Sequence, residues 1–203
     1  MERKLDDKYF INTFDEDTKI YSKKENTLLL IVDEQPRLMN ALENGEEAVV
    51  NTIALIKAFE KYDMPIIATE QYPKGLGSTD DRILEKLDQE NIFEKTIFDA
   101  AIPEVLDFIE KNKIKKVVIT GAEAHICVYQ TTRSLLNLGI DVFLPKDALA
   151  SFKESQKEDA LKTLREMGAV RTETETLLFD LARDSKDPNF KFISGLVKEM
   201  RAR

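Results

Sequence analysis

Short apolar runs alternate with helical patterns along most of this chain. Leu28–Val32 is continuously apolar and ends at Asp33, which is typical of a strand buried on both faces of a parallel sheet. Five further strands are predicted at Met64–Thr69, Ile92–Phe98, Lys116–Thr120, Ile140–Leu144 and Ala169–Arg171. Between them, apolar residues recur at helical spacing, as at Val49, Ile53 and Ile56, so helices are expected to cover the sheet.

Strict alternation of strands and helices with short connections indicates a parallel sheet that is covered on both faces. We expect a three-layer α/β/α fold of the doubly wound, Rossmann-like type, with six parallel strands in the order 3-2-1-4-5-6. Neither an internal repeat nor a long linker interrupts the pattern. Residues 27–203 are therefore expected to form one domain, preceded by a polar leader over residues 1–26.

Composition narrows the class of protein. The chain has 203 residues, 42% of them hydrophobic, and a formal net charge of −8. The acidic balance, without a basic face, speaks against a nucleic-acid partner. The apolar runs are far shorter than the ~18 residues of a membrane span, and Met1–Asp7 leads into no apolar segment. We expect a cytoplasmic protein without membrane contact.

One cysteine, Cys127, and one histidine, His125, limit the available chemistry. An internal disulfide and a cysteine cluster for metal are excluded, and so is any metal site that needs two histidines. We therefore expect neither a metal nor another cofactor.

Reactive side chains follow two central strands of the predicted sheet. Ligands bind beyond the carboxyl ends of such strands, where the strand order reverses, and this is where Asp33 and Cys127 fall. Lys95, on or beside the third strand, is the most plausible cation to join them. A helix N-terminus and an ammonium group favour a thiolate, and a carboxylate can accept the proton. Such a trio is suited to acyl transfer through a thioester.

Each residue also has a purely structural interpretation. Cys127 could be a small buried apolar residue, Asp33 a helix N-cap, and Lys95 a solvated lysine. Spacing alone does not decide between these interpretations.

Three segments resemble the signatures of the isochorismatase-like cysteine hydrolase superfamily, in particular its isochorismatase-domain-containing branch. They are Leu28–Gln35, Glu94–Phe98 and Thr120–Val128. The loop Thr69–Gly77 also matches, and the likeness extends over about residues 27–200 in the family's order.

The resemblance implies roles for individual residues. Asp33 would be the general base, Cys127 the nucleophile, and Lys95 the cation that stabilises the thiolate. The set that would line the substrate pocket or stabilise the oxyanion is Gln35, Tyr72, Glu123 and Ile126. The resemblance also places a cis peptide between Ala122 and Glu123.

One departure from the family narrows the expected activity. Its nicotinamidase members bind a metal through an aspartate and histidines, which a chain with only His125 cannot supply. We expect a cysteine hydrolase that acts on a small amide, carbamoyl or related molecule. The alternatives are a non-catalytic scaffold of the same fold and, more remotely, a receiver-like signalling domain.

The C-terminal segment bears on whether the protein assembles into oligomers. Phe190, Ile193 and Val197 share one side of a predicted C-terminal helix. This apolar side packs either within its own chain or against a second copy, and we expect a homo-oligomer.

Overall fold

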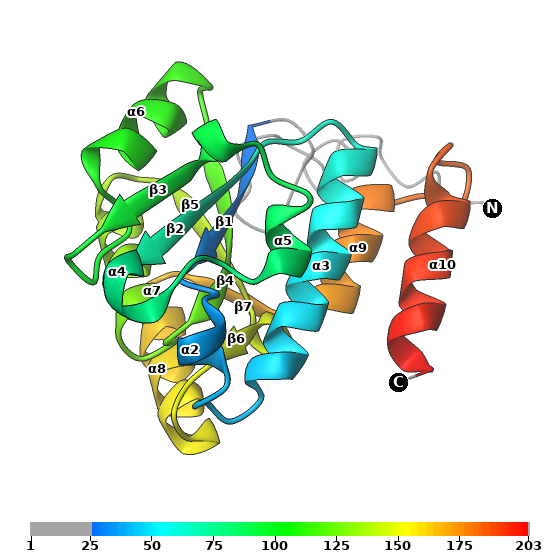
Figure 1. The fold of residues 1–203 in the computed structure, drawn as a ribbon. Helices are drawn as coiled ribbons and strands as arrows, with labels where there is room; N and C mark the ends of the chain where they lie inside the picture. Colours follow the sequence, from blue (N-terminus) through cyan, green and yellow to red (C-terminus); the bar gives the residue numbers. More distant parts are fainter. Residues whose placement is uncertain (1–25, 203) are drawn as a thin grey trace.

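The computed structural model describes residues 26–202, so most of the expected leader over residues 1–26 lies outside the described residues. A parallel sheet of seven strands forms the centre of the molecule (Figure 1). The strands are β1 (Thr27–Val32), β2 (Ile66–Gln71), β3 (Ile92–Lys95), β4 (Lys116–Ala122), β5 (Asp141–Pro145), β6 (Leu149–Ala150) and β7 (Val170–Thr172).

Strand order is β3-β2-β1-β4-β5-β7, and β6 pairs with the end of β4. This is the predicted doubly wound order with one difference. The short strand β6 was not predicted, because two residues carry no readable period. Strands β1 and β4 are paired in the middle of the sheet. Their carboxyl ends therefore lie side by side, with Val32 opposite Gly121.

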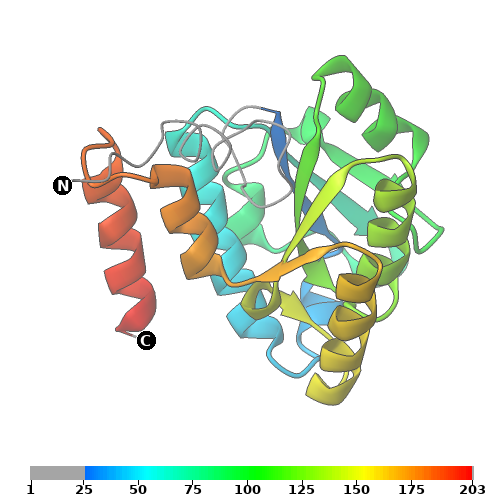
Figure 2. The ribbon, with the colours of Figure 1, turned by 180° about the vertical axis from the view of Figure 1, so that it is seen from behind.

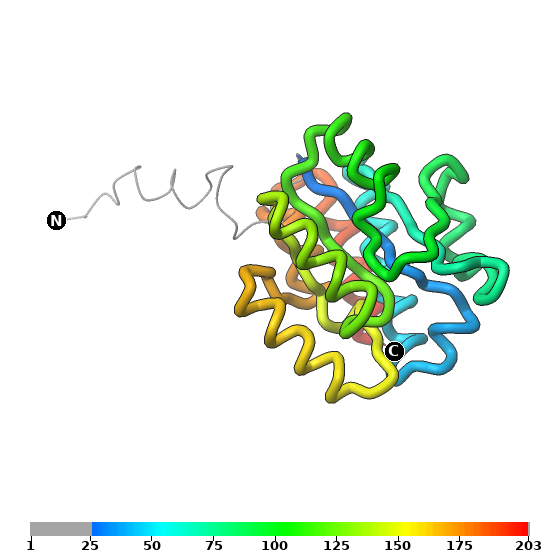
Figure 3. Tube along the Cα trace, turned by 90° about the vertical axis from the view of Figure 1, so that its left-hand side faces the viewer, coloured from blue at the N-terminus to red at the C-terminus, as the bar shows by residue number. Residues whose placement is uncertain are grey.

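Helices cover both faces of the sheet. The helices and helical turns are α2 (Pro36–Met39), α3 (Gly45–Lys61), α4 (Pro73–Leu76), α5 (Asp81–Leu84), η1 (Gln89–Asn91), α6 (Pro103–Lys111), α7 (Cys127–Asn137), η2 (Lys146–Ala148), α8 (Glu154–Glu166), α9 (Thr174–Ala182) and α10 (Phe190–Arg201). Viewed from their own side, α6, α7 and α8 lie next to one another in front of the sheet (Figure 3). Helices α3 and α9 cover the opposite face (Figure 2).

Strand β1 divides the core into two apolar clusters. Leu28, Leu30 and Val32 pack with the cluster under α6, α7 and α8, whereas Leu29 and Ile31 pack with the cluster under α3 and α9. All five side chains are fully buried, which explains why the strand is apolar on both faces.

Helix α10 settles one open question about the C-terminal segment. It lies outside α3 and α9 (Figure 2), and contacts both. Ile193 and Val197 are buried in the cluster that contains α3 and α9, and Phe190 packs against it. The apolar side of this helix is therefore covered by its own chain, which decides between the two alternatives that the periodicity left open.

Gly121 makes the close approach of β1 and β4 possible. Its φ is +106°, and an added Cβ atom would lie 2.0 Å from the carbonyl oxygen of Val32. Only glycine fits here, because a side chain would meet rigid backbone as well as an unfavourable φ.

We expect Gly121→Ala to lower the free energy of unfolding by at least about 2 kcal/mol, through backbone strain and disturbed pairing of β1 with β4. Gly195 is the matched control, because nothing lies within 4 Å of the position that a Cβ atom would take there. Gly195→Ala within α10 should be neutral or stabilise by up to about 1 kcal/mol. Urea unfolding measures both variants, and equal stabilities would contradict this explanation.

Candidate active site

The site begins at the turn that follows β1. Asp33 has a φ of +55°, a left-handed conformation that aspartate tolerates better than most residues. Its N–H donates to the carbonyl of Thr69 at 3.1 Å, and its own carbonyl accepts from the N–H of Gln35 at 2.8 Å. The turn thereby places the Asp33 side chain at the carboxyl edge of the sheet, between β1 and β2.

Lys95 ends β3 and reaches Asp33 across β2. Its Nζ lies 2.6 Å from Oδ2 of Asp33, and both side chains are completely buried. Nζ also donates to Oε1 of Gln71 at 2.7 Å and to the carbonyls of Phe98 and Ile97 at 3.1 and 3.3 Å. A buried ammonium group needs such a set of acceptors, because it has lost its water.

Asp33 is held from a second direction by Thr69, whose Oγ1 donates to Oδ1 at 2.8 Å. Burial raises the pKa of Asp33, whereas Lys95 and the hydrogen bonds from Thr69 and the Cys127 thiol act in the opposite direction. The carboxyl group can therefore take up a proton more readily than an exposed aspartate.

Cys127 is the first residue of α7 and is only 5% exposed. Burial, followed by the charge of Asp33, raises the pKa of its thiol to about 12, while Lys95 and the backbone N–H of Glu123 lower it. We expected a thiolate here from the helix N-terminus and the nearby lysine. Desolvation and the carboxylate act in the opposite direction to both, and the thiol is hydrogen-bonded to Asp33.

The remaining predicted site residues occupy different places. Glu123 follows Ala122 through a cis peptide bond, where the resemblance implies one, and its Oε2 accepts from the N–H of Phe152. Ile126 is the partly buried N-cap residue of α7, next to Cys127.

Gln35 makes its side-chain hydrogen bonds to the loop after β2. Its Nε2 donates to the carbonyls of Gln71 and Gly77 at 3.1 and 2.6 Å, and its Oε1 accepts from the N–H of Gln71 at 2.9 Å. Gln35 therefore anchors both ends of the loop that carries Tyr72.

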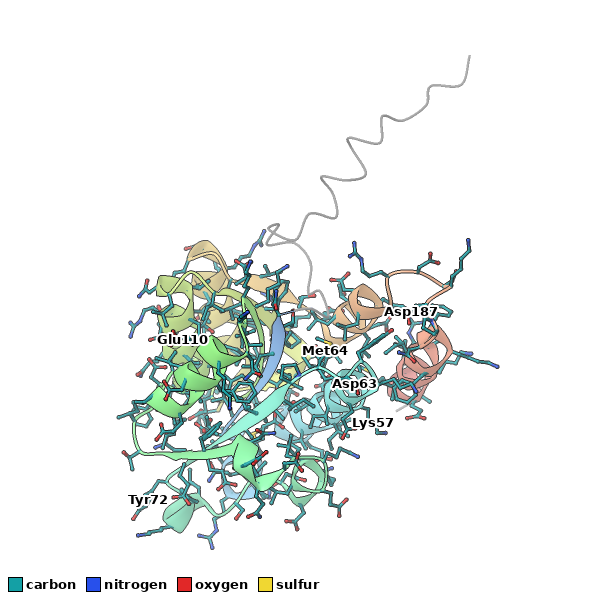
Figure 4. All side chains as sticks on the ribbon, turned by 90° about the horizontal axis from the view of Figure 1, so that it is seen from above. Lys57, Asp63, Met64, Tyr72, Glu110 and Asp187 are labelled. Atoms are coloured by element: carbon teal, nitrogen blue, oxygen red, sulfur yellow. The ribbon has the colours of Figure 1, made fainter. Side chains whose placement is uncertain are left out.

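Tyr72 is 54% exposed and lies at the outer edge of the molecule, on the side away from Asp187 (Figure 4). It lines a cavity of about 460 Å³ beside Lys95, together with Ile97, Ile102 and Lys74. This volume is within the range of small-molecule sites. The Lys95 side chain itself is fully buried, so the cavity adjoins the buried cluster of Asp33, Lys95 and Cys127 without exposing the ammonium group.

Sequence reasoning missed Thr69 and Gln71 as partners of Asp33 and Lys95. The two residues stand two apart at the end of β2, so they share one face of the strand. A polar pair at i and i+2, beyond the apolar part of a central strand, was the available signal. The predicted strand Met64–Thr69 stopped too early to include Gln71.

No group of three or more His, Cys, Asp or Glu side chains that could hold a metal occurs within residues 26–202. In the same range, no helix is long and apolar enough to cross a membrane.

An open, doubly wound sheet with polar side chains gathered at its carboxyl edge belongs to the α/β class whose ligands bind at that edge. The isochorismatase domain matches residues 27–176. The chain is 38% identical to isochorismatase family protein 1A of Dictyostelium discoideum over 180 residues, which is 86% of this chain and 87% of that protein. This chain therefore belongs to the isochorismatase family.

Solved structures agree with this assignment. A structure described as the MAR1 ribonuclease of Caenorhabditis elegans superposes with a TM-score of 0.83 at 34% identity, over 88% of this chain and 92% of that one. The nicotinamidase of Staphylococcus aureus superposes with a TM-score of 0.66 at 23% identity, over 73% of this chain and 99% of that one. The latter similarity concerns the fold alone.

We expect Gln35→Ala to loosen the loop over residues 71–77, because three hydrogen bonds that are largely shielded from water are lost, at a cost of about 1–3 kcal/mol. Hydrogen exchange in that loop should accelerate. Arg37→Ala is the matched control, since Arg37 donates to the carbonyl of Gly75 in the same loop through one exposed bond of 2.8 Å. Equal protection of the loop in both variants would show that Gln35 does not anchor it.

Proposed function

We propose that this protein is a cysteine hydrolase that cleaves a small amide, carbamoyl or related molecule through a thioester on Cys127. One contact carries the proposal: the fully buried pair of Lys95 and Asp33, 2.6 Å apart, next to a buried thiol. A structural cysteine needs neither a buried carboxylate nor a buried ammonium group beside it, and both are costly to desolvate.

In the first half of the reaction, the Cys127 thiol gives its proton to the Asp33 carboxylate as the sulfur attacks the substrate carbonyl carbon. The ammonium group of Lys95 compensates the negative charge, which moves from Asp33 to the sulfur and then to the oxyanion. The N–H of Glu123, which faces the sulfur, is suited to donate to that oxyanion. The C–N bond then breaks, and the proton on Asp33 passes to the departing nitrogen.

In the second half, water replaces the amine. Asp33 accepts a proton from water as it attacks the thioester carbonyl, and the C–S bond breaks. The sulfur leaves and recovers the proton from Asp33, so the acid product departs and the starting state is restored. No redox step or metal is required by this reaction sequence.

The cavity beside Lys95 is proposed to hold the rest of the substrate. Tyr72, Ile97 and Ile102 give it apolar walls, and Lys74 and Glu104 supply charges. Glu94 and Thr96 add further polar groups to this lining, and these groups would orient the ligand. A small molecule with an apolar body and one polar end fits this description.

Ribonuclease activity is the rival function, because a relative at 34% identity is described as the MAR1 ribonuclease. The formal net charge of −8 works against binding a polyphosphate chain. We keep the prediction that no nucleic acid is bound, and also the predictions of a cytoplasmic location and a homo-oligomer.

Ile97 and Phe98, both more than half exposed beside the cavity, are the surface where a second copy would bury apolar area.

A panel of small primary amides and carbamoyl compounds should include a substrate from which the protein releases ammonia. Cys127→Ala and Lys95→Met should each lower the turnover of that substrate by at least about a hundredfold, since both are required to form the thioester. The matched control is Lys157→Met, a lysine that is also 5% exposed but lies on α8 and pairs with Glu154. It should keep wild-type turnover.

A labelled single-stranded RNA belongs in the same panel. Cleavage of the RNA that is lost in Cys127→Ala, without ammonia release from any amide, would overturn the proposed function in favour of the ribonuclease.

A further inference from the structure

Glu34 lies between Asp33 and Gln35 in the turn after β1, and the proposed reaction does not use its side chain. It is completely buried, although it is a carboxyl group at the edge of the sheet. Its backbone carbonyl accepts from the N–H of Asp80 at 2.9 Å, so the turn is also tied to the segment that starts α5.

The Glu34 side chain points away from the cluster of Asp33, Lys95 and Cys127, toward α3. Its Oε1 accepts a short hydrogen bond of 2.6 Å from Oγ1 of Thr52, which is fully buried on that helix. The other oxygen, Oε2, has no hydrogen-bond partner among residues 26–202, and neither has the buried hydroxyl of Thr120 on β4, which faces this carboxyl group.

No lysine or arginine of the described chain lies within ion-pair distance of Glu34. The positive charge that acts on Glu34 is that of Arg82, which pairs with Asp80 at 2.9 Å and with Glu46 at 2.6 Å. The buried cation Lys95 already pairs with Asp33. An ionised Glu34 would therefore be a buried charge without a counterion, which is among the most costly arrangements in a protein.

We propose that Glu34 is a positioning residue: as a buried neutral acid it holds the turn that carries Asp33 against α3, and its ionisation releases that turn and lowers the reactivity of Cys127. The inference rests on the proposed function, because it takes Asp33 as the base for the thiol.

The electrostatics agree with this geometry. Burial raises the pKa of Glu34 to about 8, and the negative charge of Asp80 acts in the same direction. The hydrogen bond from Thr52, the nearby hydroxyl of Thr120 and the charge of Arg82 lower it. Because the folded protein binds this proton more tightly than the unfolded chain does, folding loses stability as the pH rises toward 8.

Gln is the matched replacement for a neutral glutamic acid. The Glu34→Gln side chain has the same shape, can accept from Thr52, and can donate to Thr120, but it does not ionise. If the neutral acid is the working form, this variant keeps the turn in place at every pH.

The test uses the rate at which iodoacetamide alkylates the intact protein. Cys127 is the only cysteine of the chain, so the label reports this thiol alone. Burial and the charge of Asp33 raise the pKa of this thiol, so under the proposed function its reactivity depends on transfer of the proton to Asp33.

We expect the wild-type rate to fall as the pH rises above about 8, and the Glu34→Gln rate to show no such fall while matching wild type within about threefold near neutral pH. Thr52→Val removes a bond that favours the ionised form, so it should move the fall to higher pH. Asp147→Asn neutralises another carboxyl group whose pKa burial raises, and should keep the wild-type profile.

Profiles of equal shape for wild type and Glu34→Gln would overturn the inference while leaving the role of Asp33 intact. Should Glu34→Gln not fold, Thr52→Val decides, and an unshifted fall in rate overturns the inference equally. Failure of the wild-type protein to release ammonia from any amide of the panel would instead contradict the proposed function itself.

Discussion

The ion pair between Lys95 and Asp33 is the constraint on which the site depends. Two opposite charges, both without access to water, are stable only when the remaining donors and acceptors around them are also satisfied. The structure meets this condition from three strands. Asp33 follows β1, Thr69 and Gln71 end β2, and Lys95 ends β3. The parallel register of these strands places Gln71 opposite Lys95, so the register supplies one of the acceptors that the buried ammonium group needs.

The same pair acts on the pKa of the Cys127 thiol. A cysteine at the start of a helix and near a lysine would be expected to ionise, but burial and the Asp33 charge act more strongly on Cys127. The closest contact of the Lys95 ammonium group is with Oδ2 of Asp33, at 2.6 Å. The proton on the sulfur is therefore kept until a substrate carbonyl is present, with the base already at hand. Gln35 and, by our inference, Glu34 act one step further out, by fixing the loop and the turn on either side of that base.

The amino-acid sequence predicted the layers of the fold and the order of its strands, because fully buried parallel strands such as Leu28–Val32 produce a strong apolar signal. It could not predict β6, which is too short to have a period, or the full length of β2. The end of β2 is polar because Gln71 accepts a hydrogen bond from Lys95. Polar residues at the end of a strand favour the prediction of a loop. The partner of the apolar side of α10 was also undetermined, since periodicity shows which residues share a face but not what covers it.

For the candidate site, spacing and the fold rule placed Asp33, Lys95 and Cys127 at one edge of the sheet, and the roles of these residues came from the resemblance. What no pattern revealed is the degree of burial. Full desolvation of Lys95 and Asp33, and the raised pKa of the Cys127 thiol, depend on contacts between segments far apart in the chain.

The most direct measurement of the central claim is a double-mutant cycle of unfolding free energy with Asp33→Asn and Lys95→Met. Each single variant leaves one buried group without its partner and should cost about 3–5 kcal/mol. The double variant should be no less stable than the worse single one, which corresponds to a coupling of at least about 3 kcal/mol. Strictly additive losses would contradict the claim, because the two charges would then not depend on each other.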